Sequence, residues 1–227
     1  MDKLIKQYNK RWHSPTNVYM HIQKLAKDVG FKAINKSPKY KRVREARIGA
    51  VIAFVLSRMR SLPTFLRLPL NDPPDIYLMQ PNAGTMNIIT VEITSYRESE
   101  ESLLEQLKRT KFNQTYPIEY MLLIELLTKA KADYDDICKY KIEHEIYLPV
   151  WLLSKIQDSP DTIAEVITID FKVNRLNINI GEEAYYYNNK FGSTAVIFSK
   201  RAFKPEDVRK ELCQEECQIL PWKNLED

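Results

Sequence analysis

Two acidic residues on neighbouring predicted strands could hold a divalent cation. Asp75 follows Pro74 and opens the apolar run Ile-Tyr-Leu-Met, and Glu92 lies inside a second apolar run at residues 87–94. Adjacent strands would set these carboxylates side by side, where two like charges need a cation between them. Hard oxygen ligands of this kind suit Mg²⁺ or Mn²⁺. The alternative is an aspartate in a surface turn and a solvent-facing glutamate on a half-buried strand.

A third acid, Glu45, lies on a predicted helix of residues 40–60. Helical spacing aligns it with the apolar residues of that helix, so its carboxylate ends an otherwise apolar stripe. A buried acid is costly unless it has a partner. That partner is either a metal ion or a neighbouring cation, Arg44 or Arg47.

Two lysines on the next predicted helix, residues 98–113, could supply the positive charge of such a site. Leu104, Leu107 and Lys111 follow an i, i+3, i+7 pattern, so Lys111 shares the inward face, and Lys108 lies one turn earlier. An ammonium group near metal-bound carboxylates can stabilise charge in a phosphoryl-transfer transition state or orient the attacking water. The alternative is a lysine whose alkyl chain covers apolar surface.

The elements that must position these residues indicate an α/β fold with a mixed β-sheet flanked by helices. Helices are predicted at residues 17–29, with Asn17 as N-cap and Gly30 at the end, and at residues 40–60 and 98–113. A hairpin is expected from the runs at 75–79 and 87–94, with its turn around Pro81, Asn82 and Gly84. Further strands are predicted at residues 120–127, 165–171, 175–180 and 194–198.

Linkers and repeats are not evident, so the chain is expected to form a single domain over residues 1–227. Within it, residues 1–62 would be a helical basic part, residues 70–130 a catalytic core, and residues 150–227 a C-terminal α/β extension.

Charge is distributed unevenly along the chain. Residues 1–60 hold fifteen Lys or Arg against three acids, which leaves nineteen bases and twenty-seven acids for the remainder. A basic segment of this size attracts a polyanion such as nucleic acid. Arg42, Arg44 and Arg47 are the candidates for these contacts, and the alternative is a solvated helical surface.

Several classes of protein are excluded by composition. Five glycines argue against a glycine-rich phosphate loop, and three cysteines are too few for a four-ligand zinc site. The longest apolar run, Ile48 to Leu56, is about half of what a membrane span needs, and Met1-Asp2-Lys3 starts no secretory signal. We therefore expect a soluble intracellular protein without membrane partners.

The order of these residues resembles the PD-(D/E)xK nuclease superfamily. A helix with Glu45 precedes Pro74-Asp75 on one strand, Glu92 on the next, and a following helix with a lysine. The superfamily usually places its lysine two residues after the second acid, where this chain has Thr94. The resemblance implies a restriction-endonuclease-like core, here with a helical N-terminal part.

One branch of the superfamily moves the lysine onto the next helix. This branch is the cap-snatching endonucleases of segmented negative-strand RNA viruses, found in the influenza polymerase acidic subunit and at the amino terminus of bunyavirus large proteins. The match covers about residues 17–130. Similar segments are Glu45-Ala46-Arg47, Pro74-Asp75-Ile76-Tyr77, Val91-Glu92-Ile93-Thr94, Leu104-Glu105 and Arg109-Thr110-Lys111.

The resemblance also implies a ligand set for two Mn²⁺ or Mg²⁺ ions. Asp75 would bridge the ions and Glu45 would hold one of them. The other ion would be held by Glu92, the backbone carbonyl of Ile93, and His21, whose imidazole favours manganese. Lys111 would be the catalytic lysine, with Lys108 as its substitute.

The leading hypothesis is a metal-dependent endonuclease that cleaves RNA by two-metal hydrolysis, as the cap-snatching domain of a viral RNA polymerase. Its partners would be single-stranded RNA, capped or uncapped, and the remaining polymerase domains or subunits, in the host cytoplasm or nucleus. Tyr185, Tyr186 and Tyr187 would either stack on bases or pack within a strand or loop. The alternatives are a cellular or phage DNA nuclease of the same superfamily, and a catalytically inactive nucleic-acid-binding or polymerase-assembly domain.

Overall fold

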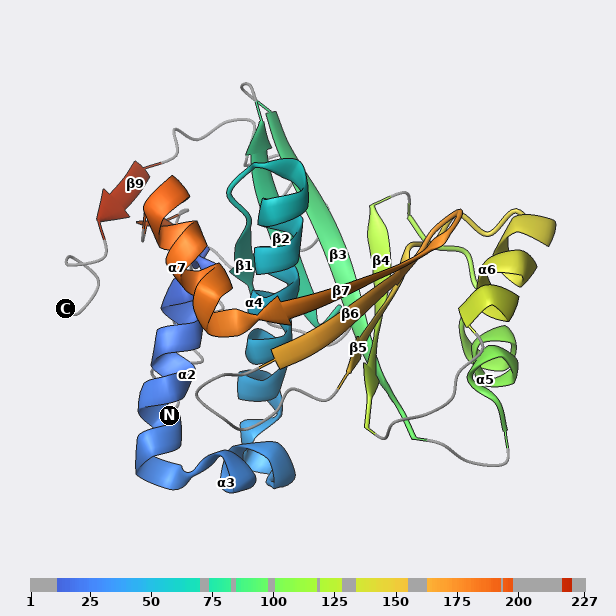
Figure 1. Ribbon diagram of the computed structural model, residues 1–227, viewed down its shortest axis with the longest axis horizontal. Coiled ribbons are helices and arrows are strands. Elements are labelled where there is room, and N and C mark those ends of the chain that lie inside the picture. Colours follow the sequence, from blue (N-terminus) through green and yellow to red (C-terminus); the bar gives the residue numbers. More distant parts are fainter. Residues whose placement is uncertain are drawn as a thin grey trace. The chain divides into compact units, whose positions relative to one another are not determined.

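The computed structural model describes residues 12–69, 74–82, 85–97, 101–117, 119–127, 134–154, 163–192, 194–197 and 218–221. The strands are β1 (Phe65–Arg67), β2 (Ile76–Asn82), β3 (Thr85–Tyr96), β4 (Tyr120–Leu126), β5 (Val150–Ser154), β6 (Ile163–Ile169), β7 (Val173–Asn179), β8 (Thr194–Ile197) and β9 (Gln218–Pro221). Strands β1 to β7 form one sheet in sequence order, and β8 pairs with β9 (Figure 1). The β3–β4 and β4–β5 pairs are parallel, whereas β1–β2, β5–β6 and β6–β7 are antiparallel. The sheet is therefore mixed, as predicted.

The helices are α2 (Pro15–Val29), α3 (Phe31–Lys36), the 3₁₀ helix η1 (Pro38–Tyr40), α4 (Lys41–Arg60), α5 (Leu103–Thr110), α6 (Tyr134–Glu143) and α7 (Ile180–Phe191). Among the described helices, none combines the length and apolar character that crossing a bilayer requires.

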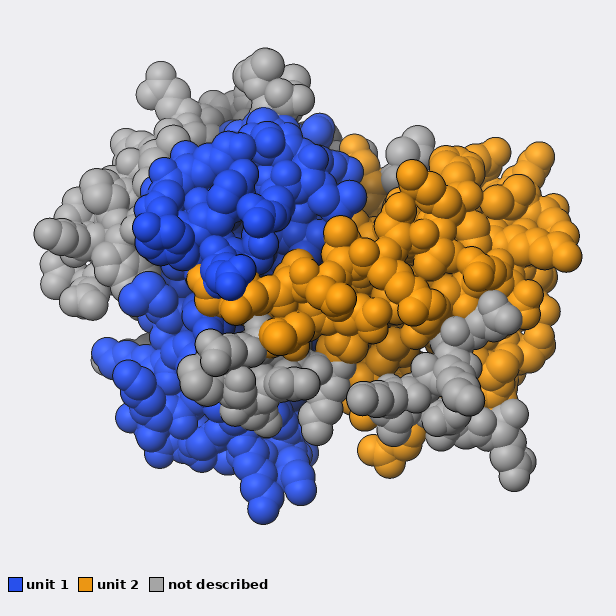
Figure 2. Space-filling view, in the orientation of Figure 1, with its two compact units in different colours: residues 1–89, 182–227 blue, residues 90–181 orange. Residues whose placement is uncertain are grey.

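The chain divides into two compact units, which Figure 2 shows in different colours. Unit 1 contains residues 1–89 and 182–227, and unit 2 contains residues 90–181. Strand β3 passes from the first unit into the second, and α7 carries the chain back. Most of α7 thus belongs to the same unit as the N-terminal helices.

Unit 1 is built around two helices whose ends follow from local chemistry. Ser14 caps α2, because its hydroxyl oxygen accepts a hydrogen bond from the Asn17 backbone N–H at 3.2 Å. The prediction of Asn17 as the N-cap was therefore wrong, since Pro15 can occupy the first helical position and start the helix earlier. Gly30 ends α2 as predicted, with a φ of 79° that favours glycine.

Helix α4 is the central element of unit 1. Its residues are buried on nearly all sides, which explains why its sequence is apolar on nearly all sides between Ile48 and Leu56. Helix α7 packs here as well: the Tyr187 ring contacts the Phe54 ring edge-on at 6.0 Å, and its hydroxyl donates to the Thr64 carbonyl at 3.2 Å. The C-terminal part of the chain thus helps to bury α4.

Gly49 allows α4 to approach β2 closely. A Cβ at this position would lie 2.6 Å from Cδ1 of Ile76, the first residue of β2. Glu45 is one helical turn before Gly49, and Asp75 directly precedes Ile76. The close packing of α4 at Gly49 against the Ile76 side chain therefore brings the segments that carry both acids together within unit 1.

Unit 2 contains a parallel β3–α5–β4 crossover. Glu92 pairs in register with Leu122, and Thr94 with Ile124. Because side chains alternate along a strand, Glu92 and Thr94 share the sheet face of Leu122 and Ile124. That face belongs to a core that α5 and α6 also enter, with Leu103, Leu107 and Ile137 among its members.

The predicted strands at residues 75–79, 87–94 and 120–127 are confirmed as β2, β3 and β4. The helix predicted at 98–113 is shorter, since Ser102 caps it by accepting from the Glu105 N–H at 3.2 Å. Elements β1, β5, α6 and α7 were not placed by the sequence. The predicted turn includes Gly84, which lies outside the described residues.

The Gly49–Ile76 contact predicts an interaction between substitutions at the two positions. Gly49→Ala gains about 1 kcal/mol of helix propensity but clashes with Ile76 Cδ1, an atom that Ile76→Val removes. We expect Gly49→Ala to be at least about 0.5 kcal/mol more favourable in the Ile76→Val background than in the wild type. Urea unfolding of the four variants measures this coupling, and strictly additive effects would contradict the proposed contact.

Candidate functional site

Glu92 and Lys111 form an ion pair inside unit 2, between Oε1 and Nζ. Lys111 follows the last residue of α5, and its backbone N–H donates to the Leu107 carbonyl at 2.8 Å. Leu103, Leu107 and Lys111 therefore form one stripe along α5, whose two leucines are buried in the core. The stripe ends with the lysine at the β3 face that carries Glu92.

This pair is largely shielded from water. The side chains of Glu92 and Lys111 are 20% and 17% exposed, respectively. Such shielding strengthens the attraction between the charges and makes either one costly without the other. The pair therefore fixes the end of α5 against β3.

Tyr116 is a neighbour of this pair that sequence reasoning missed. Burial raises the pKa of Tyr116 to about 12, and the negative charge of Glu92 acts in the same direction. The Tyr116 ring lies 5.0 Å from the ring of Tyr120, centroid to centroid, and its hydroxyl donates to Gln114 Oε1 at 3.2 Å. The sequence signal for Tyr116 was its spacing of four residues from Tyr120, which begins the buried strand β4.

Lys108, which was predicted as the substitute for Lys111, lies in a different environment. Its Nζ is 2.8 Å from Glu105 Oε1 and 4.6 Å from the centroid of the Tyr140 ring. Because of their positions on the helix, Lys111 contacts Glu92 whereas Lys108 contacts Glu105. Thr94 lies on the same face of β3 as Glu92, and the ammonium beside Glu92 comes from the end of α5.

Glu45 is buried and neutralised by cations of its own helix. Its side chain is 6% exposed, with Arg42 Nη1 at 3.0 Å from Oε2 and Lys41 Nζ at 3.5 Å from Oε1. The expectation of Arg44 as partner was wrong, because residues three or four apart face each other on a helix and adjacent residues do not. Two cations already accompany the carboxylate that was predicted to hold a metal.

The three arginines predicted to contact nucleic acid have structural contacts in unit 1. Arg42 binds Glu45, and Arg44 donates from Nη1 to the carbonyls of Ile34 and Ser37, both at 2.8 Å. Arg47 is 8% exposed, and its guanidinium lies 4.8 Å from the centroid of the Phe31 ring. Arg44 and Arg47 thus tie the α3 region to α4.

The remaining predicted ligands are divided between the units. Asp75 is 6% exposed at the start of β2, and His21 is half-buried on α2; both belong to unit 1, as does Glu45. Ile93 is half-buried on β3 and belongs to unit 2 with Glu92.

A metal ion would be compatible with the donor chemistry of these residues. Carboxylate oxygens suit Mg²⁺ and Mn²⁺. Among the described residues, however, no group of three or more His, Cys, Asp or Glu side chains is arranged to hold an ion. An ion at Glu45 would also have to compete with Arg42 and Lys41 for the same oxygens.

The aromatic residues of α7 have different environments. Tyr187 is 1% exposed in the core of unit 1, so base stacking by this residue is excluded. Tyr185 is 72% exposed. Tyr186 has Arg58 4.6 Å and Lys190 5.5 Å from its ring centroid.

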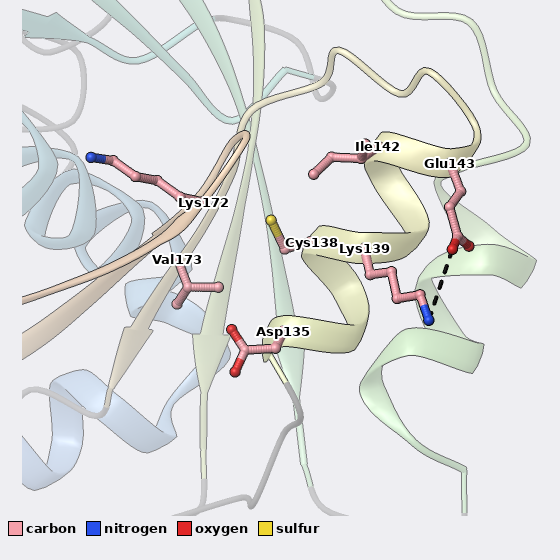
Figure 3. A pocket seen from close by; sticks show the side chains of 7 residues that line it. All are labelled: Asp135, Cys138, Lys139, Ile142, Glu143, Lys172 and Val173. Carbon is pink, nitrogen blue, oxygen red and sulfur yellow. Dashed lines mark ion pairs between the residues drawn. The ribbon is translucent and has the colours of Figure 1, made fainter.

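A surface pocket of about 590 Å³ lies in unit 2. Figure 3 shows its lining on α6 and at the start of β7, with an ion pair of 3.9 Å between Lys139 and Glu143. Its other lining residues are Asp135, Cys138, Ile142, Lys172 and Val173. The lining combines opposite charges with apolar side chains, and it includes none of the predicted site residues.

A buried lysine of unit 2 was also missed by the sequence. Lys141 on α6 is 3% exposed, and its Nζ donates to the Ile169 carbonyl at 2.5 Å. Burial lowers the pKa of Lys141 to about 8, against a smaller opposing effect of Asp170. Its role in the structure is to donate a hydrogen bond to the backbone carbonyl of the last residue of β6.

Comparison of the chain with protein-family models, with curated proteins and with solved structures finds no match. Function must therefore be argued from the side chains themselves.

The Glu92–Lys111 pair predicts a measurable coupling in stability. In a double-mutant cycle with Glu92→Gln and Lys111→Met, we expect a coupling free energy of about 1–2 kcal/mol, because both side chains are mostly buried. The matched control is Glu105→Gln with Lys108→Met, where Glu105 is 58% exposed and the coupling should stay below about 0.5 kcal/mol. Equal couplings in urea unfolding would contradict the special position of Lys111.

Lys141 predicts a rise in stability at alkaline pH. Its folded pKa of about 8 lies below the ordinary value of 10.5, so between these values the unfolded state binds more protons and stability increases with pH. The unfolding free energy of the wild type relative to Lys141→Met should increase by on the order of 2 kcal/mol across this window. Parallel pH profiles of the two proteins would show that Lys141 has an ordinary pKa.

Proposed function

We propose that the chain is a divalent-metal-dependent endonuclease that cleaves RNA by two-metal phosphodiester hydrolysis. The observation that carries this proposal is the contact between Glu92 on β3 and Lys111 at the end of α5. A carboxylate and an ammonium in this arrangement are the acid and lysine that the sequence pattern requires, with the lysine supplied by the helix after the strand.

Lys111 has the chemistry to act on a phosphodiester. Its ammonium is partly shielded from water and held by one carboxylate oxygen, which leaves further N–H donors for a phosphoryl oxygen or an attacking water. Charge that develops on the phosphoryl group would be stabilised more strongly here than at an exposed lysine. Bound divalent ions would add Lewis-acid stabilisation of the attacking and leaving oxygens.

Asp75 and Glu45 would complete the ligand set from unit 1. Both are buried, and the Gly49–Ile76 contact brings their chain segments together. Asp75 would bridge the ions, Glu45 would hold one, and Glu92, the Ile93 carbonyl and His21 would hold the other. The assignment as the cap-snatching nuclease domain of a viral RNA polymerase, acting on capped or uncapped single-stranded RNA, rests on the resemblance of the short segments around these residues.

A second candidate is a catalytically inactive nucleic-acid-binding or polymerase-assembly domain. The observation that favours it is Glu45, whose carboxylate is already satisfied by Arg42 and Lys41. A DNA nuclease of the same superfamily differs in its substrate, so cleavage of matched RNA and DNA strands by the purified protein separates it from the first proposal.

Manganese binding predicts a thermal shift that depends on Asp75. An ion at about 100 times its dissociation constant stabilises the folded state by about 2.7 kcal/mol, or roughly 5–10 °C in Tm for a chain of this size. We expect this shift in the wild type and its loss in Asp75→Asn, measured by calorimetry with MnCl₂ and with EDTA. An equal shift in both proteins would remove Asp75 from the metal site.

The two lysines predict different effects on cleavage. Lys111→Ala should lower the rate of Mn²⁺-dependent RNA cleavage at least about 100-fold, because the ammonium beside Glu92 is lost, while the manganese thermal shift remains. Lys108→Ala is the matched control on the same helix and should keep most of the rate. The reverse result, an inactive Lys108→Ala and an active Lys111→Ala, would contradict the assignment of Lys111 as the catalytic lysine and favour Lys108.

A further inference from the structure

Exposed lysines gather at one end of unit 1. Lys24 and Lys27 lie on α2, Lys32 and Lys36 on α3, and Lys39 on η1, and all five are exposed. We call them the lysine surface. In Figure 1, α3 continues from the end of α2 beside the first turns of α4, so these residues occupy neighbouring elements.

Negative charge is scarce in the part of the sequence that carries this surface. Over residues 12–44 the sequence contains a single acid, Asp28, and Glu45 beyond it is buried. Within the described part of the chain, no ion pair involves any lysine of the surface. Like charges three or four residues apart on a helix repel each other, so Lys24 with Lys27 and Lys32 with Lys36 destabilise the free protein slightly. An anionic partner relieves that repulsion.

The neighbouring arginines indicate what kind of contact remains available. Arg42 and Arg44 are engaged with Glu45 and with backbone carbonyls, so the exposed charge of this region is ammonium. Ammonium groups are point charges without the planar fork that reads base edges. They suit the phosphate backbone and bind it without regard to sequence.

We infer that the lysine surface is a single-stranded RNA-binding exosite that holds the phosphate backbone without a divalent ion. The choice of RNA rests on the proposed function. Continuity supports it: Lys41, next to the surface at the start of α4, contacts Glu45, one of the predicted metal ligands. A strand bound along the lysines would therefore lead toward that acid.

An anionic membrane fits the surface less well. Helices that bind membranes insert an apolar face, whereas the apolar stripe of α2, with Val18, Ile22 and Ala26, is buried inside unit 1. RNA requires no such face, because counterion release from its backbone supplies the affinity.

The test is the binding of a fluorescein-labelled single-stranded RNA of about 20 nucleotides, measured by anisotropy in EDTA over a range of NaCl concentrations. The variant replaces Lys24, Lys27, Lys32 and Lys36 with Gln. The control replaces Lys139, Lys172, Arg175 and Lys190 with Gln, so that it loses the same charge from other exposed positions. Circular dichroism melting checks that both variants fold.

We expect the lysine-surface variant to bind RNA at least about tenfold more weakly and to lower the slope of log K against log salt by about 2–3, since each phosphate contact on a single strand contributes about 0.7. The control should change the slope by less than about 1. Equal losses in both variants, or wild-type binding to phosphatidylserine vesicles without binding to RNA, would overturn the exosite.

Mn²⁺-dependent cleavage of a trinucleotide separates this inference from the proposed nuclease, because such a substrate has only two phosphodiester linkages and the one that is cleaved leaves too few phosphates to occupy the lysine surface. Loss of RNA binding in the variant with unchanged trinucleotide cleavage supports the exosite and the nuclease together. A wild type that binds RNA through the lysines but never cleaves supports the exosite and refutes the nuclease. Cleavage by a wild type whose RNA binding does not depend on the lysines refutes the exosite and leaves the nuclease supported.

Discussion

The parallel pairing of β3 with β4 is the constraint on which the proposed chemistry depends. Parallel strands need a crossover, and here α5 supplies it. Leu107 anchors that helix in the core, so the next turn must end at the same face of the sheet. Glu92 on β3 pairs in register with Leu122 on β4, so its side chain points to this face of the sheet. Lys111 therefore forms an ion pair with the Glu92 carboxylate there.

The acids of unit 1 present a conflict between stability and metal binding. Glu45 and Asp75 are both buried, and a buried carboxylate needs compensation. Arg42 and Lys41 provide it for Glu45, which keeps the helix α4 stable without an ion. A divalent ion at this position would have to replace those contacts, so the energetic balance between the two arrangements decides whether Glu45 can hold an ion.

The sequence predicted the parts of the fold that carry strong periodic patterns, such as α4 and the strands β2 to β4. It also placed Lys111 on the inward face with Leu107, four residues earlier, whereas the catalytic role of Lys111 stays a prediction. It did not identify Lys41 and Arg42 as partners of Glu45, since several cations were equally near in the sequence. The return of α7 to unit 1 depends on contacts such as Tyr187 with Thr64, which are distant along the chain and follow no local pattern.

The proposed function requires that acids of this chain bind divalent cations. Anomalous diffraction from a crystal soaked in MnCl₂ tests it most directly. Under the proposed function, we expect manganese peaks within coordination distance of the carboxylate oxygens of Asp75, with Glu92 as a further ligand. Manganese found elsewhere, with Glu45 still bound to Arg42 and Lys41 and no peak at Asp75, would contradict it.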